Sequence, residues 1–119
     1  MDTKRKNNTP KLIQEQARLA LAQIRSFKPH VLITLDDNAF RTVALKLVDS
    51  EIAIFFSGLN GQPEDYNKSK KYMNTREQPG HNVSGVYEML HIVDAVKVHS
   101  KLFPAFKKVR IFVDSSPTG

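Results

Sequence analysis

The sequence contains no cysteine and no tryptophan, and none of its apolar runs is long. The absence of cysteine excludes a disulfide scaffold, a thiolate zinc site and a cysteine nucleophile. No run approaches the roughly 20 apolar residues that span a bilayer. The first residues, MDTKRKNN, carry positive charge with no apolar segment behind them, so we expect no signal peptide in the chain as it stands.

The composition is that of one globular domain. The 119 residues are 40% hydrophobic and 25% charged, which argues against general disorder. A net charge of +6 raises the question of nucleic-acid binding. The lysines and arginines are dispersed, however, and do not alternate with aromatic residues as in single-strand binders. We therefore expect a solvated basic surface and no nucleic-acid partner.

An amphipathic helix is expected near the N-terminus, after a polar leader at residues 1–8. Thr9 and Pro10 predict its start, because threonine caps free N–H groups and proline fits the first turn. Pro29 ends it. A single apolar stripe connects the two ends: Ile13, Ala17, Ala20, Ile24 and Phe27.

Short apolar runs follow and predict strands. Residues 30–35 (HVLITL) and 51–56 (EIAIFF) are nearly continuous in apolar character, as in strands covered on both faces, and Ser57-Gly58 ends the second run. Residues 38–48 have helical spacing between these strands. Helices that alternate with apolar strands predict right-handed βαβ units.

The second half begins with a polar segment, residues 59–82, which is rich in turn formers and predicts a long loop. Residues 83–86 (VSGV) and 109–113 (VRIFV) predict two further strands, and residues 89–103 predict a third helix. A turn at 114–117 is expected after the last strand. The whole pattern predicts an α/β fold: an open, mainly parallel sheet flanked by helices, flavodoxin-like and incomplete, as in a segment of a larger doubly wound protein.

Candidate ligand-binding residues lie where the strands end. Ligands of open parallel sheets meet the loops at the carboxyl ends of the strands. Free N–H groups at the helix start near Asn38 suit a ligand carboxylate or phosphate. The spacing alone favours a simpler interpretation, in which Asp36 and Asp37 are only caps and turn formers. The full set of candidates is Asp36, Asp37, Asn38, Ser57, Gly58, Asn60, Tyr87 and Glu88.

Signals for catalysis or for a metal are weak. Successive strand residues point to opposite faces, so Asp36 and Asp37 would share a Mg²⁺ ion only if the turn bent them together. The four histidines lack zinc-binding spacing, and no phosphate-binding glycine loop or nucleophile elbow occurs. We expect no enzyme, no metal and no cofactor; an enzyme fragment with a metal on the two aspartates is the weakest hypothesis.

Four segments occur in an order that resembles a known family: VLITLDDNAF, IAIFFSGLN, PGHNVSGVYE and FPAFKKVRIFVDSSP. They resemble the substrate-binding proteins of ABC transporters with a type I periplasmic-binding fold, the tryptophan- and tyrosine-type binding proteins and related sensor domains. The resemblance covers about residues 10–117. It implies a non-enzymatic receptor that binds a small organic ligand, such as an amino acid, in a cleft between two lobes.

The resemblance also implies a context and a division of the chain. A membrane permease or a sensor kinase would be the partner, and the full-length protein would be periplasmic or extracytoplasmic. Residues 1–8 would be a disordered leader, residues 9–107 a partial first lobe, and residues 108–119 the first strand of the second lobe. By position, the turns at Asp36 and Ser57 would face the ligand, with Tyr87 and Glu88 near the crossover to the second lobe.

A missing neighbouring strand would leave unpaired backbone groups at a sheet edge. We therefore expect self-association through that edge, or exchange of the strand at 109–113 between chains. The contrasting hypothesis is a stand-alone flavodoxin-like α/β interaction domain, which binds another protein through its basic surface or exposed edge and has no small-molecule ligand.

Overall fold

The structure is a computed structural model that describes residues 1–3 and 5–112. The chain divides into two compact units, Met1–Glu88 and Met89–Gly119. None of the helices in the described residues is long and apolar enough to cross a membrane.

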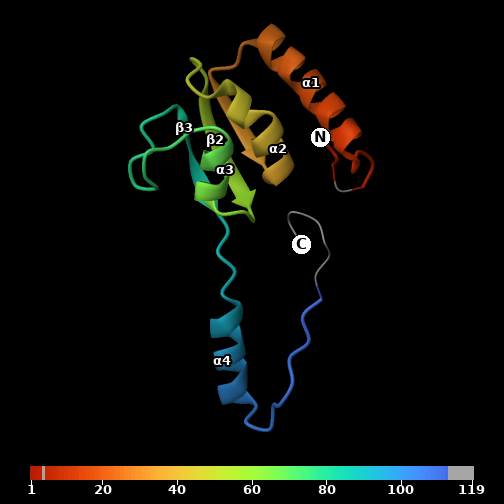
Figure 1. The fold of residues 1–119 in the computed structure, drawn as a ribbon, viewed down its shortest axis with the longest axis vertical. Helices are drawn as coiled ribbons and strands as arrows, with labels where there is room; N and C mark the ends of the chain where they lie inside the picture. The colour runs from red at the N-terminus through yellow and green to blue at the C-terminus, as the bar shows by residue number, and fades with distance from the viewer. Residues whose placement is uncertain (4, 113–119) are drawn as a thin grey trace. The chain divides into compact units, whose positions relative to one another are not determined.

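A parallel sheet forms the centre of the first unit (Figure 1). It contains three strands in the order β1 (Val31–Leu35), β2 (Ala53–Leu59) and β3 (Val83–Tyr87). Val31 lies opposite Ala53, and Ile54 lies opposite Val83. The expected α/β fold, with an open parallel sheet and flanking helices, is confirmed.

Helix α1 (Pro10–Phe27) has the expected ends. The Thr9 side chain accepts a hydrogen bond from the Leu12 N–H at 3.4 Å. After Phe27, Lys28 adopts a left-handed conformation (φ 51°) and its N–H donates to the Ile24 carbonyl. Ala17 of the predicted stripe is buried in a cluster with Val43 and with Leu21, which the stripe did not include. Phe27, the last member of the stripe, is 82% exposed.

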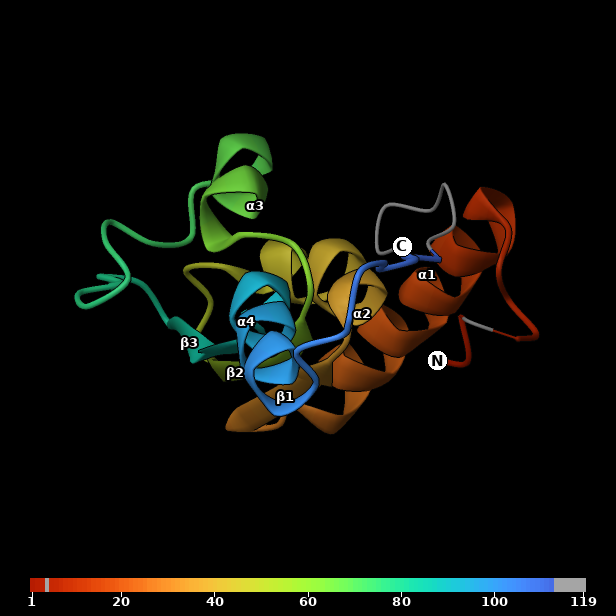
Figure 2. The same cartoon turned by 90° about the horizontal axis from the view of Figure 1, so that it is seen from below.

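The helices of the first unit lie on one face of the sheet. Helix α2 (Asp37–Thr42) and a 3₁₀ helix η1 (Ala44–Leu47) connect β1 to β2, and α3 (Pro63–Ser69) lies between β2 and β3. Both crossovers run in the same direction across the sheet, so right-handed connections place α2 and α3 on the same side; Figure 2 shows them there. The core between these layers is Phe40, Ala44, Leu45, Ile54, Phe56, Leu59, Tyr72, Met73 and Val83.

The opposite face of the sheet carries exposed apolar side chains. Ile33 is 68% exposed, Leu35 64% and Val86 69%. The prediction that the strands are buried on both faces was therefore wrong, because all the helices of Met1–Glu88 lie on one side. We call this surface the uncovered face; strand alternation assigns to it Val31, Ile33, Leu35, Ala53, Phe55, Ser57, Ser84 and Val86.

Three expected elements have different bounds. The helix expected at 38–48 is the short helix α2 followed by the 3₁₀ helix η1, and Val43 between them has a φ of −118°. Strand β2 continues through Ser57-Gly58 with an irregularity between Phe56 and Leu59, where Gly58 has a φ of 70°. The loop expected at 59–82 contains helix α3.

Asn82 connects the amino ends of the last two strands. Its side-chain N–H groups donate to the carbonyl oxygens of Leu47 at 3.0 Å and Ile52 at 2.7 Å, and its side-chain oxygen accepts the Asp49 N–H at 2.6 Å. One amide thus bonds three backbone groups, at Leu47 in the last position of η1 and at Asp49 and Ile52 in the loop that follows. This residue positions the start of β3 beside the loop that precedes β2.

The N-terminal residues form turns, and one of them is packed. Thr3 is only 9% exposed, and its hydroxyl accepts a hydrogen bond from the Asn38 side chain at 3.2 Å. The Asn7 N–H donates to the Asp2 carbonyl at 2.9 Å. At least Thr3 therefore packs on the domain, where we expected a disordered leader.

The second unit contains helix α4 (Ile92–Leu102), which has no buried residue. It begins three residues later than the expected helix. Residues 109–112 form no strand, so the strand expected at 109–113 is wrong over its described part, while Val113 and the expected turn at 114–117 lie outside the described residues. The division between the units falls after Glu88, and the lobe boundary expected near residue 108 stays a prediction.

Candidate functional site

The turns that follow all three strands meet at one edge of the sheet. The Asp36 N–H donates to the Ser57 carbonyl at 3.1 Å, and the Glu88 N–H donates to the Leu59 carbonyl at 2.8 Å. A Cβ atom at Gly58 would lie 3.8 Å from both the Asp36 nitrogen and the Glu88 Oε1 atom. Gly58 therefore lies between Asp36 and Glu88. We call this region the carboxyl edge.

Asp37 is the buried centre of the carboxyl edge, with 3% of its surface exposed. Its Oδ1 atom accepts the backbone N–H groups of Asn60 and Gly61, each at 3.2 Å. Its Oδ2 atom accepts the Asn60 side-chain N–H at 2.9 Å, and the Tyr66 hydroxyl donates to Oδ1. The carboxylate thus has four donors of its own chain. It joins β1 to the segment that leads into α3.

These donors change the ionisation of both partners. Burial alone would raise the pKa of Asp37, but hydrogen bonds from Tyr66, Asn60 and Gly61 together lower it below the usual 3.8. The pKa of Tyr66 is raised, first by burial and then by its hydrogen bond to the Asp37 carboxylate. Asp37 is therefore an anion and Tyr66 a neutral donor at neutral pH. Asp37 acts here as a structural anchor.

Asp36 serves as the N-cap of α2. Its side chain accepts the Asp37 N–H at 2.7 Å, and its backbone has a φ of 78°. The prediction that these aspartates are caps and turn formers is confirmed for Asp36, which caps α2. The cap also means that the Asp36 side chain covers the first N–H of α2, which we expected to be open to a ligand anion.

Three other candidates point elsewhere. The Asn38 side chain bonds Arg41 and Thr3, at 2.8 and 3.2 Å. Ser57 lies on the uncovered face, opposite Leu35. Tyr87 turns to the helix side, where its ring lies 4.4 Å from the Arg76 guanidinium. The carboxyl edge therefore brings together Asp36, Asp37, Gly58, Asn60 and Glu88.

A depression lies beside Asp36 at the end of β1. It encloses about 270 Å³ and combines apolar and acidic lining: Met1, Asp2, Thr3, Leu35, Asp36 and Ala39. This volume is slightly below that of ordinary small-molecule pockets. Two of the lining residues, Asp2 and Asp36, are acidic.

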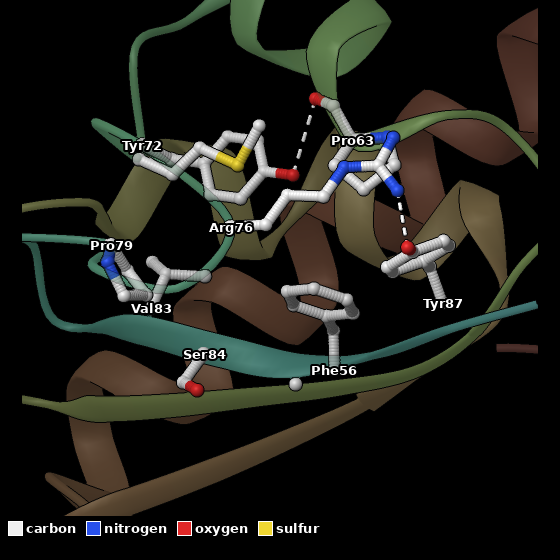
Figure 3. Close-up of a pocket in the computed structure, with 10 residues that line it drawn as sticks. Phe56, Pro63, Tyr72, Arg76, Pro79, Val83, Ser84 and Tyr87 are labelled. Carbon is white, nitrogen blue, oxygen red and sulfur yellow. Dashed lines mark hydrogen bonds between the residues drawn. The ribbon is translucent and has the colours of Figure 1, made fainter.

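A second depression lies between α3, the segment after it and β3 (Figure 3). Arg76 lies across Tyr87 there, and Phe56 lies on the strand below. The enclosed volume is only about 50 Å³, which is room for little more than water. Arg76 is also bonded to Glu64 at 2.7 and 2.6 Å, which lowers the pKa of Glu64 to about 2. Arg76 thus connects the segment after α3 to Glu64 on α3 and to Tyr87 on β3.

Sequence reasoning missed Gly61, Tyr66 and Arg76. Tyr66 lies on α3, whose start has a readable signal: Pro63 in the first turn, followed by Glu64 and Asp65 near the positive end of the helix dipole. That signal was available, but the turn formers around it obscured it. Arg76 has no comparable local signal.

Comparisons with protein-family models, curated proteins and solved structures find no match for this chain. Within residues 1–3 and 5–112, no group of three or more histidine or acidic residues could hold a metal ion. The fold and the carboxyl edge define a small α/β domain with polar strand ends on one side of a parallel sheet.

Proposed function

We propose that this chain is part of a solute-binding receptor, which binds a small polar organic ligand at the carboxyl edge. The observation that supports this is the convergence of the turns after β1, β2 and β3, connected by the hydrogen bonds of Asp36, Asp37 and Glu88. Parallel sheets bind ligands at this place. The protein would bind without catalysis.

The chemistry of the edge favours a ligand that carries an ammonium group. Glu88 places a carboxylate oxygen beside Gly58, and Asp2 and Asp36 line the neighbouring depression, although the chain as a whole has a net charge of +6. Leu35 and Ala39 add apolar surface to the depression beside Asp36. An amino acid or a related amine has this combination of charge and apolar body. Asp37 would hold the turns in place without contacting the ligand.

The wider context is proposed from the motif order alone. A two-lobed receptor would enclose the ligand against a second lobe, and a membrane permease or a sensor kinase would be its partner outside the cytoplasm. The four motifs resemble that family in order, and the carboxyl edge is the side on which such a receptor would bind its ligand.

Ligand binding is tested by two-dimensional NMR of the chain titrated with the standard amino acids and simple amines. We expect shifts of the amides of Asp36, Gly58 and Glu88 that saturate with one ligand. Glu88→Gln should weaken that binding about tenfold, as expected when an ion pair with a ligand is removed. Glu51→Gln is the matched control, because Glu51 is exposed just before the amino end of β2.

Absence of saturable shifts with every amino acid and amine would contradict the proposal for this chain. Equal weakening by Glu88→Gln and Glu51→Gln would place any binding elsewhere. The second candidate, an α/β interaction domain without a small ligand, is favoured by one observation: the uncovered face.

A further inference from the structure

We propose that two copies of this chain associate through the uncovered faces of their sheets. The apolar side chains on this face are strongly exposed: Val31 52%, Ile33 68%, Leu35 64%, Phe55 47% and Val86 69%. The remaining positions are Ala53, Ser57 and Ser84. The face therefore carries no charged side chain on any of its three strands.

The absence of charge argues for a partner of the same kind. Strands that face water alternate apolar with polar residues and include charges that prevent association. This face has neither feature, although a quarter of the chain is charged. A partner surface must then be apolar and uncharged, and a second copy of the face meets that requirement. A two-fold axis lets the same patch serve both copies.

The geometry allows close packing of two such faces. Sheets pack face to face about 10 Å apart, with their strands about 30° from parallel. Phe55 lies on the central strand, with Ile33 of β1 and Ser84 of β3 opposite it in register. The bulky side chains of the outer strands would therefore surround Phe55 at the centre of the contact.

The size of the face sets the expected affinity. If each of the five large side chains buries about 100 Å², the two copies together bury about 1,000 Å². That is the lower limit of specific interfaces, so the dissociation constant should lie at about 1–100 μM. Leu35 belongs both to this face and to the lining of the depression beside Asp36, so the contact would cover part of that depression. The inference rests on the exposed apolar side chains and does not depend on ligand binding.

Sedimentation velocity over a concentration series tests the inference. We expect the wild-type chain to reach twice its 13.5 kDa mass. The double variant Ile33→Lys, Val86→Lys should stay monomeric at the same concentrations, because like charges would meet across the axis. Phe27→Lys is the matched control: Phe27 is 82% exposed at the end of α1 and belongs to no strand, so this variant should dimerise like the wild type.

A mixing experiment separates lost contact from lost folding. The Ile33→Glu, Val86→Glu chain should also be monomeric alone, and should form a heterodimer with the lysine variant, since opposite charges then meet. A wild-type monomer at all concentrations would overturn the inference. Dimers that survive the lysine substitutions would assign the contact to a sheet edge. A dimer that Val93→Lys on α4 disrupts would make a helix the occupant of the face, which also overturns it.

Discussion

The backbone N–H of Asn60 lies 3.2 Å from the Asp37 Oδ1 atom, and this hydrogen bond connects the turn after β1 to the turn after β2. The two residues are 23 positions apart in the chain. Their contact positions the polar groups of the carboxyl edge. The Asp37 carboxylate itself accepts hydrogen bonds from Asn60, Gly61 and Tyr66. Asp37 therefore stabilises this edge, and in the proposed receptor other residues would contact the ligand.

Replacing Asp37 with asparagine should reduce the free energy of unfolding by about 3 kcal/mol at pH 7, because an amide would face N–H donors with one of its own. Since the folded pKa of Asp37 is below its usual 3.8, its contribution is complete well above pH 3.8. It is lost as the pH falls through the folded value. Urea denaturation from pH 7 to pH 2 measures this.

The wild-type curve should therefore fall more steeply below pH 3.8 than the Asp37→Asn curve. Glu64→Gln is the control, because the pKa of Glu64 is also lowered, to about 2, by Arg76 at an exposed site. Parallel curves for the wild type and Asp37→Asn would show that the Asp37 hydrogen bonds contribute nothing to acid stability.

Replacing Tyr66 with phenylalanine should cost about 2 kcal/mol, the typical value for a hydrogen bond to a charged group. The ring would remain, edge-on to Phe40 with centroids 5.4 Å apart, so packing is preserved. Chemical denaturation at pH 7 measures the loss. In the double variant with Asp37→Asn, the two losses should not add, because both substitutions break the same contact; full additivity would refute the pairing.

Replacing Asn82 with aspartate should destabilise the chain by about 2 kcal/mol or more, because a carboxylate would face the carbonyl oxygens of Leu47 and Ile52. Asn74→Asp makes the same change at an exposed position and serves as control. Thermal unfolding followed by circular dichroism compares the two. Equal melting temperatures would mean that the Asn82 side chain does not hold the amino ends of the strands.

The sequence predicts the parallel sheet and α1 well, because their signals are local. Thr9 and Pro10 mark the helix start, and the apolar runs mark the strands. Whether a strand is covered on one face or both depends on where the crossover helices lie, and the runs at β1 and β2 are alike in either case. The helix after β1 is interrupted where two β-branched residues, Thr42 and Val43, follow one another.

The carboxyl edge was predicted in outline, since parallel strands end on the same side. The role of Asp37 was not predictable, because its hydrogen-bond donors belong to Asn60, Gly61 and Tyr66, which follow β2 in the sequence. The direction of Tyr87 depends on Arg76, which is 11 residues away on an irregular segment. Spacing places residues at the end of a strand but does not say which way their side chains turn.

The contacts of Arg76 with Glu64 on α3 and with Tyr87 on β3 have a consequence for the integrity of the chain. The Asn67 side chain also bonds the backbone of Tyr72 and Met73, both of which are buried. Cleavage of the exposed peptide between Lys70 and Lys71 would therefore leave each new end attached to the domain. We therefore expect that the polypeptide can be opened here, or extended by added residues, with little effect on the sheet.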